Sequence, residues 1–241
     1  MRLAVVSDIH GNLTALEAVI ADLKVTSPDL VLQGGDLVLN GPRPADVVDR
    51  IRDRQWAGVV GNTDEVLWAP EQFDRHVERA PRLRELLEIL CHETAPATRE
   101  LLGGERVQWL RALPHEWRGY GIGLLHASPG DLWLAPMPDC EEQQLVATYG
   151  DFGSALVVYG HIHRPYVRRV AGFVVANSGS VGMPYDGDPR ASYLLIENGN
   201  VTIRRVEYDV EVEIKQLLSS GYPHAAWLAN VRRRGKYAPP F

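Results

Sequence analysis

Cysteine is scarce in this sequence: only Cys91 and Cys140 occur among 241 residues, and they do not form a CxxC pair. This scarcity argues against a small disulfide-stabilised scaffold and against a zinc site built from cysteine pairs. Two isolated cysteines are more typical of a reducing compartment. We therefore expect a cytoplasmic protein.

Long apolar runs are also missing. The apolar stretch at residues 3–6 is soon followed by Asp8 and is too short for a signal peptide. No stretch reaches the roughly 20 consecutive apolar residues that a membrane helix needs. The sequence therefore predicts a protein without a membrane partner.

Positive charge does not dominate, because 25 Lys and Arg residues stand against 31 Asp and Glu residues, a net charge of −6. Such a chain gains little from a nucleic-acid backbone, and the short basic run at residues 232–234 is expected to be solvated. No GxxxxGK[ST] loop is present, so ATPase chemistry of that kind is unsupported. A bound metal would still create a local cationic site for a small phosphorylated substrate.

What the sequence does contain is an alternation of short apolar runs with helical patterns. Strands are expected at residues 3–6, 29–33 and 57–60, separated by helices at residues 13–23 and about 42–54. Strand and helix alternating at this spacing predict a parallel sheet of an α/β domain. Apolar residues make up 45% of the chain, which is enough to form a full core.

The second half follows a different pattern. Residues 70–112 are expected to form a helical insertion that acts as scaffold or lid, and residues 121–125 and 155–159 to be strands around a helix at 141–149. Short strands joined by glycine turns then predict an antiparallel meander, at residues 166–170, 173–176, 192–196 and 201–206. We expect one domain over residues 1–209, with a helical extension at 210–241 packed on it.

Side chains of the metal-ligand type follow five predicted strands. These residues are Asp8, His10, Asp36, Asn62, His126, His161 and His163. Open parallel sheets bind ligands beyond the carboxyl ends of their strands, so we expect the seven to converge. They are too many for one tetrahedral zinc, whereas two ions about 3.5–4 Å apart would use them well. Imidazole, carboxylate and amide ligands suit Mn, Fe, Ni or Zn.

The same residues lie in five ordered motifs. These are Asp8-Ile9-His10-Gly11-Asn12, Gly35-Asp36, Gly61-Asn62-Thr63-Asp64, His126 and Gly160-His161-Ile162-His163. Together they resemble the calcineurin-like metallophosphoesterases, closest to the small bacterial and archaeal phosphodiesterase-like branch, over about residues 1–209. The resemblance implies a four-layer αββα sandwich of two mixed sheets flanked by helices.

The resemblance also implies how the ions are held. One metal would take Asp8, His10, Asp36 and His163, and the second would take Asp36, Asn62, His126 and His161. Asp36 would bridge the two ions together with a hydroxide, and the family's reaction is in-line attack of that hydroxide on phosphorus. No side-chain nucleophile is then needed.

One position departs from the family. Many members carry a histidine after the Gly-Asn pair, thought to protonate the leaving group, whereas this chain has Thr63. A threonine hydroxyl is a poor general acid near neutral pH, so the general acid is unknown and Asp64 loses its orienting role. Activated diesters and nucleotide anhydrides are therefore expected to react better than alkyl monoesters.

Other polar residues have weaker signals. Asn12 could contact substrate phosphate or simply cap a helix, Thr63 could contact substrate, and the glycine-rich turn at residues 177–182 is expected to be structural. Ordinary surface roles are favoured for Arg43 and Arg164. Surface or internally hydrogen-bonded positions are expected for His76, His92, His115 and His224.

The leading interpretation is a two-metal phosphodiesterase. A dinucleoside polyphosphate hydrolase is an alternative that would need aromatic surface for a base, with candidates Trp56, Trp68, Trp133 and Tyr185. A protein or small-molecule phosphomonoesterase is disfavoured by Thr63, and a metal-free binding or scaffold module by the complete ligand set. The sequence leaves homo-oligomerisation open.

Overall fold

The computed structural model describes residues 1–240, and its strands form two five-stranded sheets. The strand order is β10-β9-β1-β2-β3 in the first sheet and β4-β5-β6-β8-β7 in the second. The strands are β1 (Arg2–Val6), β2 (Leu30–Gln33), β3 (Ala57–Gly58), β4 (Glu116–Gly119), β5 (Ile122–Leu125), β6 (Leu156–Tyr159), β7 (Tyr166–Val170), β8 (Phe173–Asn177), β9 (Ala191–Glu197) and β10 (Asn200–Val206).

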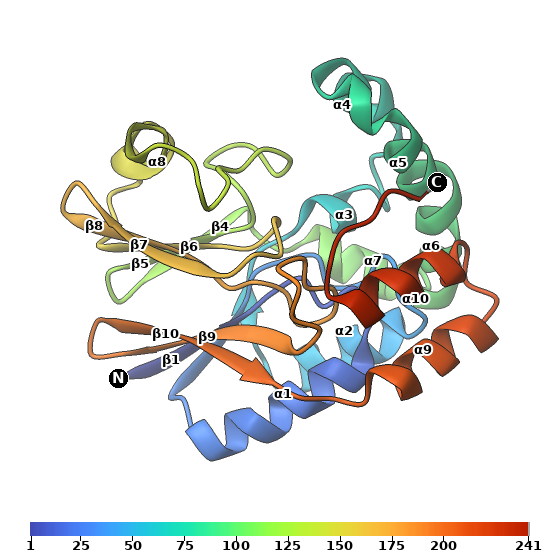
Figure 1. Ribbon diagram of the computed structural model, residues 1–241, viewed down its shortest axis with the longest axis horizontal. Coiled ribbons are helices and arrows are strands. Elements are labelled where there is room, and N and C mark those ends of the chain that lie inside the picture. The colour runs from blue at the N-terminus through green and yellow to red at the C-terminus, as the bar shows by residue number, and fades with distance from the viewer. Residues whose placement is uncertain (241) are drawn as a thin grey trace.

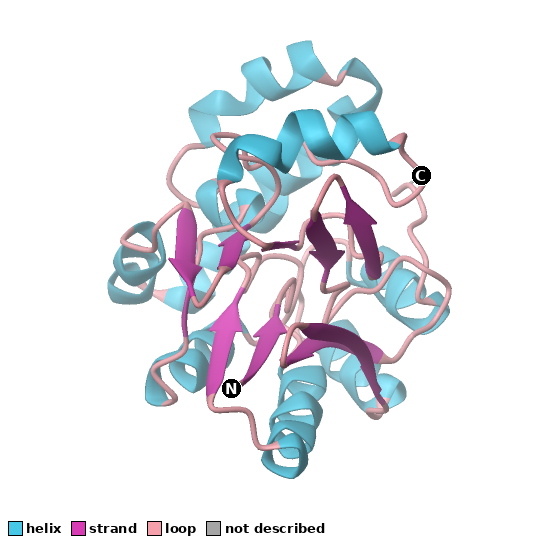
Figure 2. Cartoon of the chain, turned by 90° about the vertical axis from the view of Figure 1, so that its left-hand side faces the viewer, coloured by secondary structure: helices cyan, strands magenta, loops and turns pink. Residues whose placement is uncertain are grey.

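Helices cover the outer faces of the stacked sheets (Figures 1 and 2). The α-helices are α1 (Leu13–Thr26), α2 (Pro44–Asp53), α3 (Asn62–Glu65), α4 (Phe73–Arg79), α5 (Arg84–Glu88), α6 (Ala95–Leu102), α7 (Gly104–Arg111), α8 (Glu142–Tyr149), α9 (Val210–Ser219) and α10 (Ala225–Arg234). A π-helical stretch at Ile89–Thr94 joins α5 to α6, and short 3₁₀ turns lie at Pro70–Gln72, Pro81–Leu83 and Gly150–Phe152.

Alternation along β1 shows how the layers are built. Leu3 and Val5 belong to the apolar cluster between the two sheets, together with Leu124 of β5. Ala4 and Val6 point to the other face and pack in the cluster that contains the buried side of α1. A third cluster joins the second sheet to α8. These three apolar layers confirm the predicted four-layer sandwich.

The predicted antiparallel meander is wrong as one unit. β7 and β8 form a hairpin in the second sheet, where β8 pairs in parallel with β6. β9 and β10 form another hairpin that joins the first sheet, antiparallel to β1. Hairpin turns fix only neighbouring strands, so the sequence pattern could not show that the two hairpins separate. Strand β4 was not predicted, whereas α10 lies within the predicted helical extension at residues 210–241.

The helical stretch predicted at residues 70–112 is helical in the structure, and α4 and α5 project from the sandwich (Figure 1). The C-terminal helices α9 and α10 pack on each other, and α9 also packs on α1. Their apolar cluster includes Met183, which lies beside the strand ends of the sandwich. Within residues 1–240, no helix has the length and apolarity required to cross a membrane.

Candidate metal centre

The loops that follow β1 and β2 lie side by side and continue the strand pairing. The amide of Asp8 donates to the carbonyl of Gly35 at 3.0 Å, and the amide of His10 donates to the carbonyl of Asp36 at 3.1 Å. Side chains from these two loops therefore project from the same edge of the first sheet. This edge carries the first three ligand-type residues of the sequence.

Two glycines let the other loops approach. A Cβ atom at Gly61 would lie 2.1 Å from Oδ1 of Asp36, and one at Gly160 would lie 2.4 Å from Oδ2 of Asp8. Gly160 follows β6 of the second sheet, whereas Asp8 follows β1 of the first. Only a residue without a side chain allows the two sheets to bring their loops this close.

Left-handed backbone is concentrated at the same place. Five of the seven predicted ligands have positive φ, namely Asp8 (56°), His10 (51°), Asp36 (54°), His161 (67°) and His163 (55°). Non-glycine residues adopt this conformation rarely, and such strain gathers at functional sites. The turns are needed because each side chain must aim back over the strand ends.

Four of the predicted ligands form one compact group. Asp8, His10, Asp36 and His163 each offer one ligand atom, all of them within 4.8 Å of one another, and all four residues are buried. Nε2 of His163 lies 3.1 Å from Oδ1 of Asp8, and Nε2 of His10 lies 3.7 Å from Oδ2 of Asp36. A carboxylate and imidazole group of this size could hold one metal ion.

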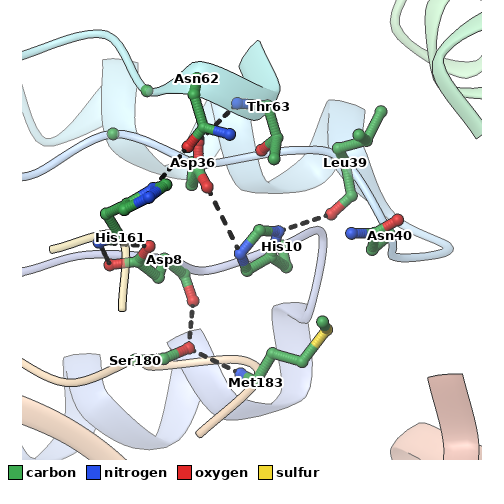
Figure 3. Close-up of polar contacts among 12 residues, drawn as sticks. Asp8, His10, Asp36, Leu39, Asn40, Asn62, Thr63, His161, Ser180 and Met183 are labelled. Carbon is green, nitrogen blue, oxygen red and sulfur yellow. Dashed lines mark hydrogen bonds and ion pairs between the residues drawn. The ribbon is translucent and has the colours of Figure 1, made fainter. Parts of the chain in front are cut away.

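The hydrogen bonds of His10 and His163 show which ring nitrogens are free. Nδ1 of His10 donates to the carbonyl of Leu39 at 2.9 Å (Figure 3). Nδ1 of His163 donates to the carbonyl of Met183 at 2.6 Å. In a neutral ring, Nε2 then carries a lone pair. The two Nε2 atoms lie 3.1 Å apart, a contact between lone pairs that a cation would relieve.

A second group repeats this arrangement. Nδ1 of His126 donates to the carbonyl of Gly34 at 2.8 Å, and Nε2 of His161 donates to the carbonyl of Trp133 at 3.1 Å. The other nitrogen of each ring lies 2.8 and 2.9 Å from Oδ1 of Asn62. Three acceptor atoms therefore face one another, and the structure brings all seven predicted ligands together.

The electrostatics fit metal ligands. Burial lowers the pKa of His10 and of His161 to about 4, which keeps both rings in the neutral form that binds metal. Burial raises the pKa of Asp8, but the neighbouring histidines, His163 first, outweigh this effect and bring its pKa to about 2. Asp36 and Asp8 raise the pKa of His126 despite its burial.

Asp64 has a structural role here, in place of orienting the family histidine that this chain lacks. Its buried carboxyl accepts hydrogen bonds from the amides of Leu37 at 3.0 Å and Gly61 at 3.2 Å. Burial and the nearby Asp36 raise its pKa to about 7. Asp64 thus ties the loop after β2 to the start of α3, and so fixes Asp36 against Asn62.

The two predicted substrate contacts have different surroundings. Oδ1 of Asn12 caps α1 by accepting from the amide of Ala15, and its Nδ2 donates to the Gly182 carbonyl and the Tyr208 hydroxyl. A contact of Asn12 with substrate would require breaking one of these bonds. Thr63 is buried, lines the cleft at the metal centre, and its hydroxyl has no hydrogen-bond partner among the described residues.

Two expectations about basic residues are wrong. His76 was expected at the surface or internally hydrogen-bonded, but it is buried, and its Nδ1 has no hydrogen-bond partner in the described chain. Arg232 was expected to be solvated but is fully buried, because it lies on the inner face of α10. Arg43 makes internal contacts: its Nη2 donates to Oε2 of Glu213 at 2.8 Å and to Oγ1 of Thr14 at 2.6 Å.

Some supporting residues were missed. The hydroxyl of Ser180 donates to the carbonyl of Asp8 at 2.6 Å and accepts from the amide of Met183 at 2.7 Å (Figure 3). It thereby joins the glycine-rich turn to the loop after β1, which supports the structural role expected for this turn. Asn40 lines the cleft beside His10. Neither residue had a signal beyond its position near a predicted motif.

Known proteins resemble the chain over nearly its whole length. A family model described as calcineurin-like phosphoesterase superfamily domain matches residues 1–200. An uncharacterized protein of Methanocaldococcus jannaschii is 30% identical, covering 94% of this chain and 95% of that protein. Phosphodiesterase YfcE of Escherichia coli is 26% identical, covering 84% of this chain and 91% of YfcE.

Solved structures agree. A metallophosphoesterase from Sphaerobacter thermophilus has a TM-score of 0.79 at 27% identity, covering 98% of this chain and 99% of that one. A hypothetical protein from Pyrococcus horikoshii has the same fold, with a TM-score of 0.83 at 21% identity and the same coverage. With motifs, fold and family match in accord, the chain belongs to the calcineurin-like phosphoesterase superfamily.

Proposed function

We propose that the chain is a phosphodiesterase that works with two divalent cations. One cation would be held by Asp8, His10, Asp36 and His163, and the other by Asp36, Asn62, His126 and His161. The observation that carries this proposal is the set of four imidazoles. Each gives one N–H to a backbone carbonyl and turns its other nitrogen toward further acceptor atoms.

Asp36 is placed to serve both cations. Its Oδ2 lies 3.7 Å from Nε2 of His10, whereas its Oδ1 lies 3.5 Å from Nε2 of His126. Each carboxylate oxygen thus faces one ligand group. The amide of Thr63 donates to Oδ1 at 2.9 Å and holds the carboxylate in this orientation.

When bound, such cations would supply a water that is nucleophilic near neutral pH and would neutralise charge on the phosphoryl oxygens. The backbone-anchored histidines keep their rings fixed through the reaction, so little reorganisation is needed. Mn, Fe, Ni and Zn all suit this ligand set.

A diester is favoured over a monoester for two reasons. Thr63 offers no efficient general acid, which favours substrates with good leaving groups. The candidate metal ligands also form the floor of a largely apolar cleft of about 650 Å³, which leaves room for organic groups beside the phosphate. The resemblance to phosphodiesterase YfcE is consistent with this choice.

The test measures metal content and hydrolysis together. Protein freed of metal by a chelator is titrated with Mn, Fe, Ni or Zn, and bound metal is counted for each chain. We expect two ions per chain and faster hydrolysis of bis(p-nitrophenyl) phosphate than of p-nitrophenyl phosphate. Asp36→Asn should lower the rate by about 100-fold or more and reduce the metal content.

Asp53→Asn, at the exposed end of α2, is the matched control and should retain both properties. A single bound ion, or a preference for the monoester, would contradict the proposal.

A further inference from the structure

The cleft beside the metal centre has walls that differ strongly from its floor. Leucines at positions 83, 86, 87 and 90, around α5, form one wall, and Leu134 and Met137 lie on the loop before α8. Leu134 and Met137 are among the few large apolar side chains that the chain leaves exposed, at 53% and 39%. Exposed apolar groups gathered around a cleft indicate a ligand surface.

Two aromatic pairs are attached to the ligand histidines. The ring of Tyr185 stacks on His163, with centroids 4.3 Å apart, and meets the ring of Tyr237 edge-on at 5.6 Å. The ring of Trp133 stacks on His76 at 3.9 Å, and the carbonyl of Trp133 accepts from His161. Tyr185 and Trp133 therefore contact proposed metal ligands directly, and Tyr237 and His76 each contact one of these two residues.

Polar atoms on these walls favour a heteroaromatic ring over an alkyl chain as the occupant of the cleft. The hydroxyls of Tyr185 and Tyr237 have no hydrogen-bond partner among the described residues, and neither ring nitrogen of His76 has one. An alkyl chain would cover these groups without bonding to them, which costs free energy. A heteroaromatic ring offers both a flat face for stacking and polar edges that can reach such groups.

Charge points the same way. Arg79 and Arg82 line the cleft from the helical insertion, and Asp36 is the only carboxylate among the described lining residues. Arg79 pairs with Asp131, whereas Arg82 is exposed and has no ion pair within residues 1–240. Within the described chain, Arg82 therefore brings an unpaired positive charge to the cleft wall, which suits an anionic substrate.

We infer that this cleft binds a heteroaromatic group of the nucleobase kind, carried by a phosphodiester whose phosphate lies at the metal centre. This inference rests on the proposed function. Trp227 and Tyr237 supply part of the wall, and both lie beyond residue 200, where the family match ends. The insertion and the C-terminal segment thus add to the surface that Trp133 and Tyr185 provide from the loops of the sandwich.

Three diesters with the same scissile bond test the inference by turnover. Methyl, n-octyl and thymidine-5′ p-nitrophenyl phosphate share one leaving group and differ only in the second arm. We expect kcat/KM for the thymidine ester to exceed that for the methyl ester by about tenfold or more, as stacking of one base allows. Equal values for these two esters, or a higher value for the octyl ester, would overturn the inference.

A binding measurement keeps the test independent of turnover. Titration calorimetry on the Mn-loaded protein compares thymidine 5′-monophosphate, methyl phosphate and octyl phosphate. Thymidine 5′-monophosphate should bind about tenfold more tightly than either of the other two. If no diester is hydrolysed, the proposed function fails, and the calorimetric comparison still decides whether the cleft selects a base.

Variants of Tyr237 assign the effect to the cleft. Tyr237→Ala should lower the preference for the thymidine compounds about fivefold, and Tyr237→Phe should retain most of it, because the ring is kept. Tyr120→Ala is the control, since Tyr120 is 73% exposed in the turn before β5, at the opposite end of that strand from His126. Equal effects of Tyr237→Ala and Tyr120→Ala would refute the assignment.

Discussion

At the scale of single residues, we expect Thr63 to determine how strongly the reaction rate depends on the leaving group. It is buried, lines the cleft at the candidate metal centre, and its hydroxyl makes no hydrogen bond to the described residues. Thr63→His would place an imidazole there, and general acids of this kind contribute about 10²–10⁴-fold to poor leaving groups. We expect the variant to hydrolyse alkyl esters faster, measured as kcat/KM over methyl diesters with leaving groups of increasing pKa.

Thr63→Ser is the control and should keep the steep dependence on leaving-group pKa. If wild-type protein already hydrolyses alkyl monoesters as fast as p-nitrophenyl diesters, the argument from Thr63 is wrong. An unchanged slope in Thr63→His would likewise mean that another group protonates the leaving oxygen.

Arg232 stabilises the loop that carries His10, one of the candidate metal ligands. Its Nη2 donates to the carbonyls of His10 at 3.2 Å and Asn40 at 2.7 Å, and the side chain is fully buried. Arg232→Met would leave both carbonyls without this donor, so the loop carrying His10 loses its support. We expect Mn affinity to fall by about 10–100-fold, as for other changes behind metal ligands, measured by titration calorimetry.

Arg233→Met tests the neighbouring position on the same helix. Arg233 is exposed and pairs only with Glu211, so its loss should leave Mn affinity unchanged. Should both variants bind Mn equally well, Arg232 has no part in positioning His10.

These residues also show what the sequence could predict. The seven candidate ligands could be grouped from the sequence because each follows a strand end, and this position is readable from apolar runs and glycines. The burial of Arg232 and His76 was not predicted, because a polar residue on the inner face of a helix looks the same in sequence as one on the outer face. Their burial depends on how α10 and α4 pack, and no local pattern encodes that contact.

At the scale of elements, the turn between β8 and β9 locks onto the loop after β1. The amide of Gly182 donates to the carbonyl of Asp8 at 3.0 Å, and a Cβ atom there would lie 1.8 Å from the carbonyl oxygen of Ile9. Gly182→Ala should therefore displace the loop and lower the free energy of unfolding by about 1–3 kcal/mol, measured by urea unfolding.

Gly104, at the start of α7, provides the comparison. Nothing lies within 4 Å of a Cβ atom built there. Gly104→Ala should raise the free energy of unfolding by about 0.5 kcal/mol, because alanine restricts the unfolded chain more than glycine does. Equal losses for the two variants would show that close packing at Gly182 is not the cause.

Elements were predicted better than their pairing. The patterns gave the strands of both sheets apart from β4, which is only Glu116–Gly119 and has alternating exposed residues. The order of strands within the sheets was harder to predict, because β8 pairs with β6 although β7 lies between them in the sequence. Such pairing depends on contacts between distant segments, and strands of four or five residues carry little information about their partners.

At the scale of the whole molecule, the buried histidines make metal-free stability depend on pH. The pKa values of His10 and His161 are about 4 in the folded protein, against about 6.5 in an unfolded chain. As pH falls below 6.5, the unfolded state takes up protons first, so the free energy of unfolding decreases until about pH 4. Asp64, with its pKa raised to about 7, takes up its proton first in the folded state and opposes this trend over the same window, whereas the raised pKa of His126 acts mainly above pH 6.5. Below pH 6.5 two histidines therefore act against one carboxyl group.

Urea unfolding in the presence of a chelator, from pH 7.5 to 4, measures this effect. Each of the two histidines contributes a slope of up to about 1.4 kcal/mol per pH unit within the window. His161→Gln should make the dependence shallower. Stability that stays constant between pH 6.5 and 5 would contradict the assignment of neutral, buried rings.

The bond from Arg232 to the His10 carbonyl also has a consequence for biosynthesis. Arg232 is added 69 residues after His163, the last of the proposed ligands, so at about 5–20 residues per second it follows about 3–14 s later. During that interval a nascent chain already carries every ligand but lacks the donor that holds the His10 loop. Tight capture of the ions should therefore wait until α10 has left the ribosome and docked.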